Sequence, residues 1–218
     1  MTGNTASATA SPFPILIGYR ATGKTTVAMA LAGQFGCQSL DADDAFEQQT
    51  GCSIAQFISD KGEPAFREAE TSVLCDLLSR PETILATGGG VVLREENRRL
   101  IRQAARPVIW LTAPAAEIRR RLAADPSTAA RRPALAGGSV LDEVGQALAD
   151  REPAYREVAD VSFDTTTCAT SALVAAIGAW LRAWPGLGPA AIDWPTRWFS
   201  PNGRSLRSLS SCQWRKMR

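Results

Sequence analysis

The chain has 218 residues, of which 45% are apolar and 21% are charged, a balance typical of a folded globular protein. This length suits one catalytic domain with a buried core. The sequence contains no histidine, which excludes chemistry that needs a histidine base, nucleophile or metal ligand. Its cysteines are widely spaced and include no CxxC pair, so neither a disulfide framework nor a zinc site is expected, and a reducing cytoplasm fits.

The net charge of +2 is unevenly distributed along the chain. Residues 185–218 hold six Lys and Arg but only one acid, so the rest of the chain is slightly negative. We therefore interpret the arginines of the main part as ligands for small anions rather than as a polyanion-binding face. No segment approaches the roughly 20 consecutive apolar residues that a membrane span needs. Neither nucleic acid nor a membrane is expected as a partner.

The first 13 residues, rich in Thr, Ala and Ser, are predicted to form a disordered leader without an export signal. From Pro14 onward, short apolar runs alternate with longer segments of helical periodicity, as in PILIGY followed by TTVAMALAGQF. This alternation predicts a parallel sheet covered by helices on both faces, with ligands at the carboxyl ends of the strands. The domain is expected to span residues 14–184.

Residues 18–25, GYRATGKT, match the phosphate-binding pattern GxxxxGK[ST] between an apolar run and a helical segment. In such a loop the backbone N–H groups and the helix N-terminus face phosphate oxygens, while the lysine adds a positive charge. A glycine-rich turn without nucleotide is the alternative, but the GKT ending in this context favours ATP or GTP. The candidate phosphate ligands are Gly18, Ala21, Thr22, Gly23, Lys24, Thr25 and Thr26, and the Thr25 hydroxyl also suits Mg²⁺.

Carboxylates follow where the second strand is expected to end. Asp41 and Asp43 would point to the same side of an extended chain, one toward a metal and one toward an acceptor hydroxyl. The alternative is that Asp43 or Asp44 caps the N-terminus of the next helix.

An arginine and a glycine triplet complete the candidate acceptor site. Arg67 and Glu70 are one helical turn apart, so the carboxylate can orient the guanidinium, although such pairs are usually solvated. Gly88, Gly89 and Gly90 follow the apolar run ILAT, where missing Cβ atoms permit a ligand to approach closely or simply give a flexible turn.

Two later segments lack a regular pattern. Residues 122–138 gather small, polar and turn-forming residues, which predicts a mobile lid. Residues 185–218, rich in Pro, Gly, Ser and Arg, are expected to be a basic, disordered tail without a catalytic part. A segment that binds a partner or nucleic acid is the alternative for this tail.

In order and spacing, the segments GYRATGKTT, SLDADDAFE, GEPAFREAE, ILATGGGVV, RRPAL and REPAYREVAD resemble the shikimate kinase family. The resemblance covers about residues 14–184. It implies a three-layer α/β domain like that of nucleoside monophosphate kinases, with a five-stranded parallel sheet and a mobile lid. It also implies transfer of the γ-phosphoryl group of ATP to the 3-hydroxyl of shikimate, a step of aromatic amino-acid biosynthesis, by a cytoplasmic monomer.

The resemblance assigns individual roles at the acceptor end. Asp41 would lie near Mg²⁺, and Asp43 would orient the attacking hydroxyl and accept its proton. Arg67 and Arg151 would bind the acceptor carboxylate, which planar guanidiniums do bidentately. The triplet 88–90 would offer backbone groups to the ring hydroxyls.

At the nucleotide end the resemblance implies that Lys24 and Arg132 neutralise charge on the transferring phosphoryl group. Arg132 belongs to the lid, which is longer here than in short family members. Arg121 or Arg120 would pack on the adenine.

Two other functions share some of these features. One is phosphorylation of another sugar acid, such as gluconate, because two arginines for a carboxylate do not name the acid. The other is a catalytically silent nucleotide-binding module that works through its basic tail. The FRxxE and TGGG elements favour shikimate. An active enzyme is favoured because the chain has all five charged residues of the proposed site, which are Lys24, Asp43, Arg67, Arg132 and Arg151.

Overall fold

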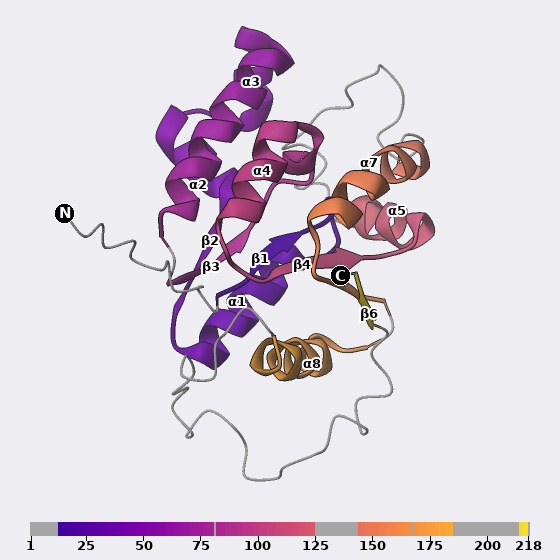
Figure 1. The fold of residues 1–218 in the computed structure, drawn as a ribbon. Helices are drawn as coiled ribbons and strands as arrows, with labels where there is room; N and C mark the ends of the chain where they lie inside the picture. The colour runs from indigo at the N-terminus through magenta and orange to yellow at the C-terminus, as the bar shows by residue number, and fades with distance from the viewer. Residues whose placement is uncertain (1–12, 81, 125–143, 167, 185–213, 218) are drawn as a thin grey trace, which may run out of the picture.

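The computed structural model describes residues 13–80, 82–124, 144–166, 168–184 and 214–217 (Figure 1). Its six strands form one sheet in the order β2-β3-β1-β4-β5-β6. The first five strands run parallel and confirm the predicted parallel sheet. Their bounds are Ile15–Ile17 for β1, Gln38–Asp41 for β2, Thr83–Ala86 for β3, Val108–Thr112 for β4 and Val161–Asp164 for β5.

Helices cover both faces of this sheet, so the three-layer arrangement is confirmed (Figure 1). One face carries α1 (Lys24–Phe35) and α8 (Thr170–Arg182). The opposite face carries α2 (Ala42–Thr50), α3 (Ile54–Leu78), α4 (Glu95–Gln103) and α7 (Val144–Val158), with the short 3₁₀ helix η1 (Val91–Leu93) before α4. Helix α5 (Ala115–Ala124) packs beside α7.

The central strands show why this sequence needs two layers of helices. Successive side chains of a strand point to opposite faces, so Leu16 packs with α1 and α8 while Ile15 and Ile17 pack with α2, α3 and α7. All three residues of β1 are buried, as are the four of β3. Strands buried on both faces are expected to be nearly continuous apolar runs, which is the pattern of the central strands β1, β3 and β4.

The sheet has one strand more than the sequence predicts. Strand β6 (Trp214–Lys216) lies antiparallel to β5, with Ser162 opposite Arg215. Beyond it, the Met217 N–H donates to the Asp160 carbonyl at 3.0 Å, and the Met217 side chain packs against the core. The expectation that residues 185–218 form a disordered tail is therefore wrong for 214–217. Residues 1–12, residues 185–213 and most of the expected lid, with Arg132, lie outside the described residues.

A buried arginine connects two central strands at their amino-terminal ends, opposite the carboxyl ends of the strands. The Arg106 guanidinium donates to the backbone carbonyls of Phe13, at 2.9 Å, and of Thr83. Burial lowers the pKa of Arg106 to about 10, while the carbonyl oxygens around it favour the charged form. This arginine joins the beginnings of β1 and β3, so its role is structural, and it does not belong to the cleft described below.

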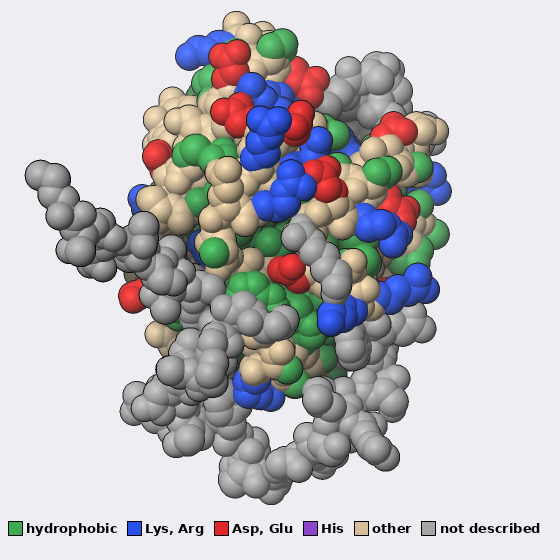
Figure 2. Space-filling view, in the orientation of Figure 1, with side chains coloured by type: hydrophobic (Ala, Val, Ile, Leu, Met, Phe, Trp, Pro, Cys, Tyr) green, Lys and Arg blue, Asp and Glu red, His purple; other side chains and the backbone are tan. Residues whose placement is uncertain are grey.

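The surface and the cysteines add two observations. On the face drawn in Figure 2, basic and acidic side chains are interleaved, and Arg98 and Arg102 of α4 both pair with Glu157 of α7. No helix in the described part of the chain has the length and apolar character to cross a membrane. Cys37, Cys52 and Cys75 are free, whereas Cys168 is disulfide-bonded, a bond that the cysteine spacing does not indicate.

Candidate active site

A cleft of about 600 Å³ opens at the carboxyl ends of the parallel strands. This is where ligands bind in open parallel α/β sheets. Twelve of the residues proposed from the sequence line it together, although they come from six separate segments of the chain. These residues are Ala21, Thr22, Gly23, Lys24, Thr25, Thr26, Asp41, Asp43, Arg67, Gly89, Arg121 and Arg151.

The phosphate-binding loop connects β1 to α1 and is held by contacts to its own backbone. A Cβ atom on Gly18 would collide with the Leu111 carbonyl, so only glycine fits there. The Thr22 hydroxyl and the Lys24 ammonium both donate to the Tyr19 carbonyl, at 2.7 and 2.8 Å. Lys24 is 8% exposed, and its charge is therefore fixed at the start of α1. The arrangement provides a cation and a helix N-terminus for an anion.

Two residues of this loop adopt the left-handed backbone conformation. Gly23, with φ 86°, precedes the first residue of α1. Ala21 has φ 61°, although it carries a Cβ atom, and such a conformation is uncommon outside glycine. The loop thus carries local backbone strain at the point where it faces the cleft.

The carboxylates after β2 are arranged differently from the sequence prediction. Asp41 ends the strand and caps α2, because its side chain accepts from the Asp43 N–H at 2.9 Å. Asp43 lies inside the first turn of α2, so the two residues do not share one face of an extended chain. Capping by Asp43 or Asp44 is wrong as well, since the cap is Asp41. The Thr25 hydroxyl donates to the other Asp41 oxygen at 2.6 Å, which joins this strand end to the phosphate-binding loop.

Arg67 is fixed by two carboxylates. Helix α3 is interrupted at Gly62, whose φ of 83° and ψ of 163° are not helical, and the part after this break carries Arg67 toward the cleft. The guanidinium pairs with Glu70 at 2.8 Å and with Glu63 at 3.0 Å, and it lies over the Phe66 ring. Burial acts to lower the pKa of Arg67, but Glu70 and Glu63 outweigh it and raise that pKa. The interpretation of a merely solvated pair is therefore wrong, because both Arg67 and Glu70 are largely buried.

The glycine loop after β3 lies between Arg67 and Arg151, the two arginines that the sequence suggests for an acceptor carboxylate. A Cβ atom on Gly90 would lie 2.5 Å from Nη1 of Arg67, and one on Gly89 would lie 3.0 Å from the Arg20 nitrogen. From the other side, Arg151 of α7 donates to the Gly89 carbonyl at 3.2 Å. The absence of side chains thus permits close approach of an arginine and of the phosphate-binding loop. The glycines therefore have a packing role here beyond that of a flexible turn.

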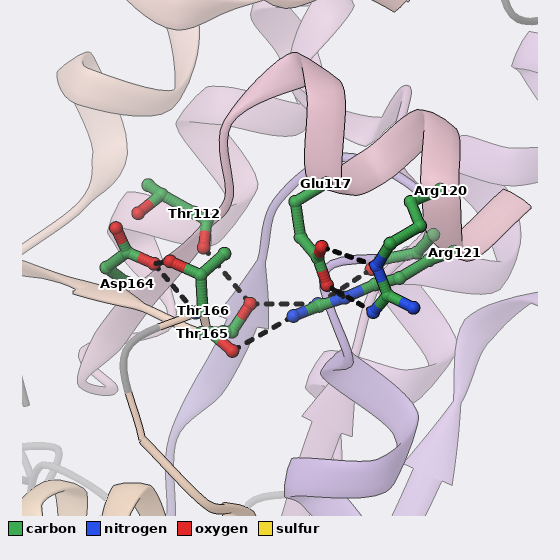
Figure 3. A network of polar contacts seen from close by, with 8 residues as sticks. Thr112, Glu117, Arg120, Arg121, Asp164, Thr165 and Thr166 are labelled. Carbon is green, nitrogen blue, oxygen red and sulfur yellow. Dashed lines mark hydrogen bonds and ion pairs between the residues drawn. The ribbon is translucent and has the colours of Figure 1, made fainter.

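Arg121 connects α5 to two loops through a network of polar contacts (Figure 3). Its guanidinium donates to the Ala21 carbonyl at 3.1 Å and to the Thr165 hydroxyl and carbonyl, each at 3.0 Å. Glu117 accepts from both Arg120 and Arg121, and these hydrogen bonds lower the pKa of the carboxyl to about 2. Of the two arginines proposed for the adenine, Arg121 lines the cleft and Arg120 projects outside it.

Three of the proposed glycines do not line the cleft. Gly18 and Gly90 lie beneath it against Leu111 and Arg67, and Gly88 begins the glycine loop. Several lining residues were not foreseen, and the aromatic ones carried a signal. Tyr19 is inside the phosphate-loop motif, and Phe66 directly precedes Arg67. Tyr155 does not line the cleft, but its hydroxyl donates to the Gly89 carbonyl, and it stands four residues after Arg151 on the same face of α7.

Fold and cleft together define the class of the protein: a small P-loop kinase whose cleft holds further arginines next to the phosphate-binding loop. Residues 20–182 match the shikimate kinase family. A shikimate kinase from Rhodopirellula baltica is 42% identical over 151 residues, which cover 69% of this chain and 80% of that protein. One from Oleidesulfovibrio alaskensis is 41% identical over 160 residues, covering 73% and 91%.

A solved structure agrees with these relatives. A shikimate kinase from Acinetobacter baumannii in complex with shikimate is 32% identical, with a TM-score of 0.73, and the match covers 80% of this chain and 95% of that one. The chain belongs to the shikimate kinase family.

Proposed function

We propose that this protein catalyses transfer of the γ-phosphoryl group of ATP to the 3-hydroxyl of shikimate. One observation carries the proposal. Arg67 and Arg151 come from different helices and meet the same glycine loop, which lies against the phosphate-binding loop. A carboxylate held by two guanidiniums there would stand within reach of the nucleotide phosphates. The membership of the family supports shikimate as the acid.

In the proposed reaction, Lys24 and the N-terminus of α1 hold the β and γ phosphates, and Asp43 orients the acceptor hydroxyl. The bond between the γ phosphorus and the bridging oxygen breaks as the hydroxyl oxygen bonds to that phosphorus. The hydroxyl proton passes to Asp43, and ADP leaves. Such transfers depend on positioning and on neutralisation of charge on the phosphoryl oxygens, because their transition states are loose.

The residues at the end of β2 suit a magnesium ion. Mg²⁺ prefers hard oxygen ligands, and the Thr25 hydroxyl and Asp41 carboxylate meet beside the phosphate-binding loop. These two residues would hold the ion directly or through water. When bound, the ion supplies further positive charge to the β and γ phosphates.

Steady-state ADP formation with ATP and Mg²⁺ tests the proposal, with shikimate and gluconate as parallel acceptors. We expect turnover that depends on shikimate, and phosphate transfer to that acid detected by mass spectrometry. Turnover on gluconate without turnover on shikimate would identify a different sugar-acid kinase. Tight ATP binding without ADP formation on either acid would indicate a silent nucleotide-binding module.

Replacing the proposed proton acceptor should separate binding from chemistry. Asp43→Asn removes the carboxylate but keeps the size of the side chain, so we expect turnover to fall at least about 100-fold, because positioned acid–base groups contribute 10²–10⁴-fold. ATP affinity measured by calorimetry should change little. Asp44→Asn, one position along α2 and exposed, is the matched control and should retain wild-type turnover. Full activity of the Asp43 variant would exclude the role assigned to it.

A further inference from the structure

Tyr155 of α7 contacts the glycine loop from inside the protein. Its side chain is completely buried, and its hydroxyl donates to the Gly89 carbonyl at 2.5 Å. The same carbonyl accepts from Arg151 at 3.2 Å. A carbonyl oxygen has two lone pairs and accommodates both donors. The acceptor arginine and the tyrosine, one helical turn apart on α7, therefore share one backbone atom.

The tyrosine ring is held firmly. It stacks on Trp110 of β4, with ring centroids 5.5 Å apart and an angle of 20° between the planes. Trp110 is itself 9% exposed and belongs to the core beneath the helices. A hydroxyl on such a ring has little freedom to move. Its hydrogen bond therefore holds the Gly89 peptide at a fixed position relative to the sheet.

Gly89 needs an anchor of this kind. Glycine has wide backbone freedom, so neighbouring contacts must fix the orientation of its peptide. The loop cannot be stiffened by a side chain, because a Cβ atom on Gly89 would lie 3.0 Å from the Arg20 nitrogen and 3.4 Å from the Tyr19 carbonyl carbon. The Tyr155 hydroxyl fixes the Gly89 peptide without adding atoms to the loop.

Arg151 has a second support from the nucleotide side. Its guanidinium carbon lies 5.1 Å from the centre of the Tyr19 ring, which is 1% exposed and belongs to the phosphate-binding loop. A guanidinium over an aromatic face is attracted to the ring electrons. Arg151 is thus oriented by the ring of Tyr19 and by the Gly89 carbonyl.

We propose that Tyr155 is a positioning residue for the acceptor site: its hydroxyl fixes the Gly89 carbonyl, and that carbonyl aims Arg151 at the acceptor carboxylate. The inference rests on the proposed role of Arg151 as a carboxylate ligand. Tyr155 touches neither substrate, and its effect is transmitted through Gly89 and Arg151. Tyr155→Phe removes only the hydroxyl and keeps the ring against Trp110, so it isolates this effect.

The test compares steady-state kinetics of the wild type, Tyr155→Phe, Arg151→Lys and the double variant. We expect Tyr155→Phe to raise the KM for shikimate roughly three- to ten-fold, the range that the loss of one hydrogen bond gives. The kcat and the KM for ATP should change less than about two-fold. In the Arg151→Lys background, Tyr155→Phe should raise the KM for shikimate by less than about 1.5-fold, because the two residues act in one chain of contacts.

A control distinguishes positioning from a general loss of stability. Val158→Ala removes buried methyl groups from the same helix and leaves the side chains of Tyr155 and Arg151 unchanged. It should lower the melting temperature and leave both KM values unchanged. An unchanged shikimate KM in Tyr155→Phe, or an effect that persists in full beside Arg151→Lys, would overturn the inference. Wild-type protein without shikimate turnover would instead contradict the proposed function.

Discussion

Ala21 holds a left-handed backbone conformation inside the phosphate-binding loop, with φ 61°. Its carbonyl also accepts from Arg121, so this strained residue lies where the loop, α5 and the Thr165 loop meet. A non-glycine residue in this region costs about 1–3 kcal/mol, and surrounding contacts must maintain it. The loop is therefore not at its stability optimum.

Ala21→Gly should relieve this strain. Glycine loses more entropy on folding, which offsets part of the gain, so we expect a net stabilisation of about 0.5–1 kcal/mol. For a domain of this size that is a rise in melting temperature of about 1–4 °C, measurable by calorimetry. Ala105→Gly is the matched control, because Ala105 has φ 50° in an exposed turn away from the cleft and should respond alike. A lower melting temperature in both variants would show that positive φ costs little here.

At the scale of a single element, the break in α3 decides where Arg67 lies. Gly62 has φ 83° and ψ 163°, a combination that only glycine adopts readily, and Pro64 follows at the start of the second helical part. A straight helix through this position would rotate Glu63 and Arg67 relative to the cleft. The motif GEPAFRE therefore consists of a helix break at its glycine, followed by the N-terminus of the second helical part.

Gly62→Ala should destabilise the protein by about 1–3 kcal/mol, since space is available but the conformation is not. We also expect a higher KM for shikimate, because the substitution disturbs the part of α3 that carries Arg67. Gly33→Ala is the opposite control. Gly33 is exposed inside α1 with open space around its Cβ position, so alanine there should stabilise by about 0.5–1 kcal/mol. Urea unfolding of both variants measures these changes. Equal stability of the Gly62 variant and the wild type would show that the break in α3 does not require glycine.

Elements with strong local signals were predictable from the sequence. The apolar run of β1, the GKT ending and the helical pattern of α1 specify a strand, loop and helix within one short segment. The region after β2 was less predictable, because Asp41, Asp43 and Asp44 are all good capping residues and only the chain's path decides which one caps α2. The contacts of Tyr155 were not foreseen, since a buried tyrosine is usually only a core residue.

At the scale of the whole molecule, β6 was the least predictable element. Three residues, Trp-Arg-Lys, show no alternation of apolar and polar side chains, and their conformation depends on pairing with β5, over 50 residues earlier. Tertiary context outweighs local preference in such short strands. Because this pairing joins segments so far apart in the sequence, composition alone suggested a basic, disordered tail.

Deleting residues 214–218 should therefore lower stability without changing the chemistry. Loss of the β5 pairing and of the Met217 contacts is expected to cost about 2 kcal/mol, or roughly 4–8 °C in melting temperature. The shikimate KM and the turnover per folded molecule should stay at wild-type values. The double variant Arg215→Ala with Lys216→Ala keeps the backbone pairing and should melt within about 2 °C of the wild type. Identical melting of the truncated and full chains would mean that β6 contributes nothing to stability.

The added strand also determines which edge the sheet presents to other molecules. Without it, the sheet would end at Val161–Asp164, an almost wholly buried strand whose free N–H and C=O groups could pair with a second chain. With it, the edge is a three-residue strand whose exposed residues include Arg215 and Lys216. Short edges bearing cations are a common protection against edge-to-edge aggregation. We therefore expect the last strand to make the protein less prone to self-association at high concentration.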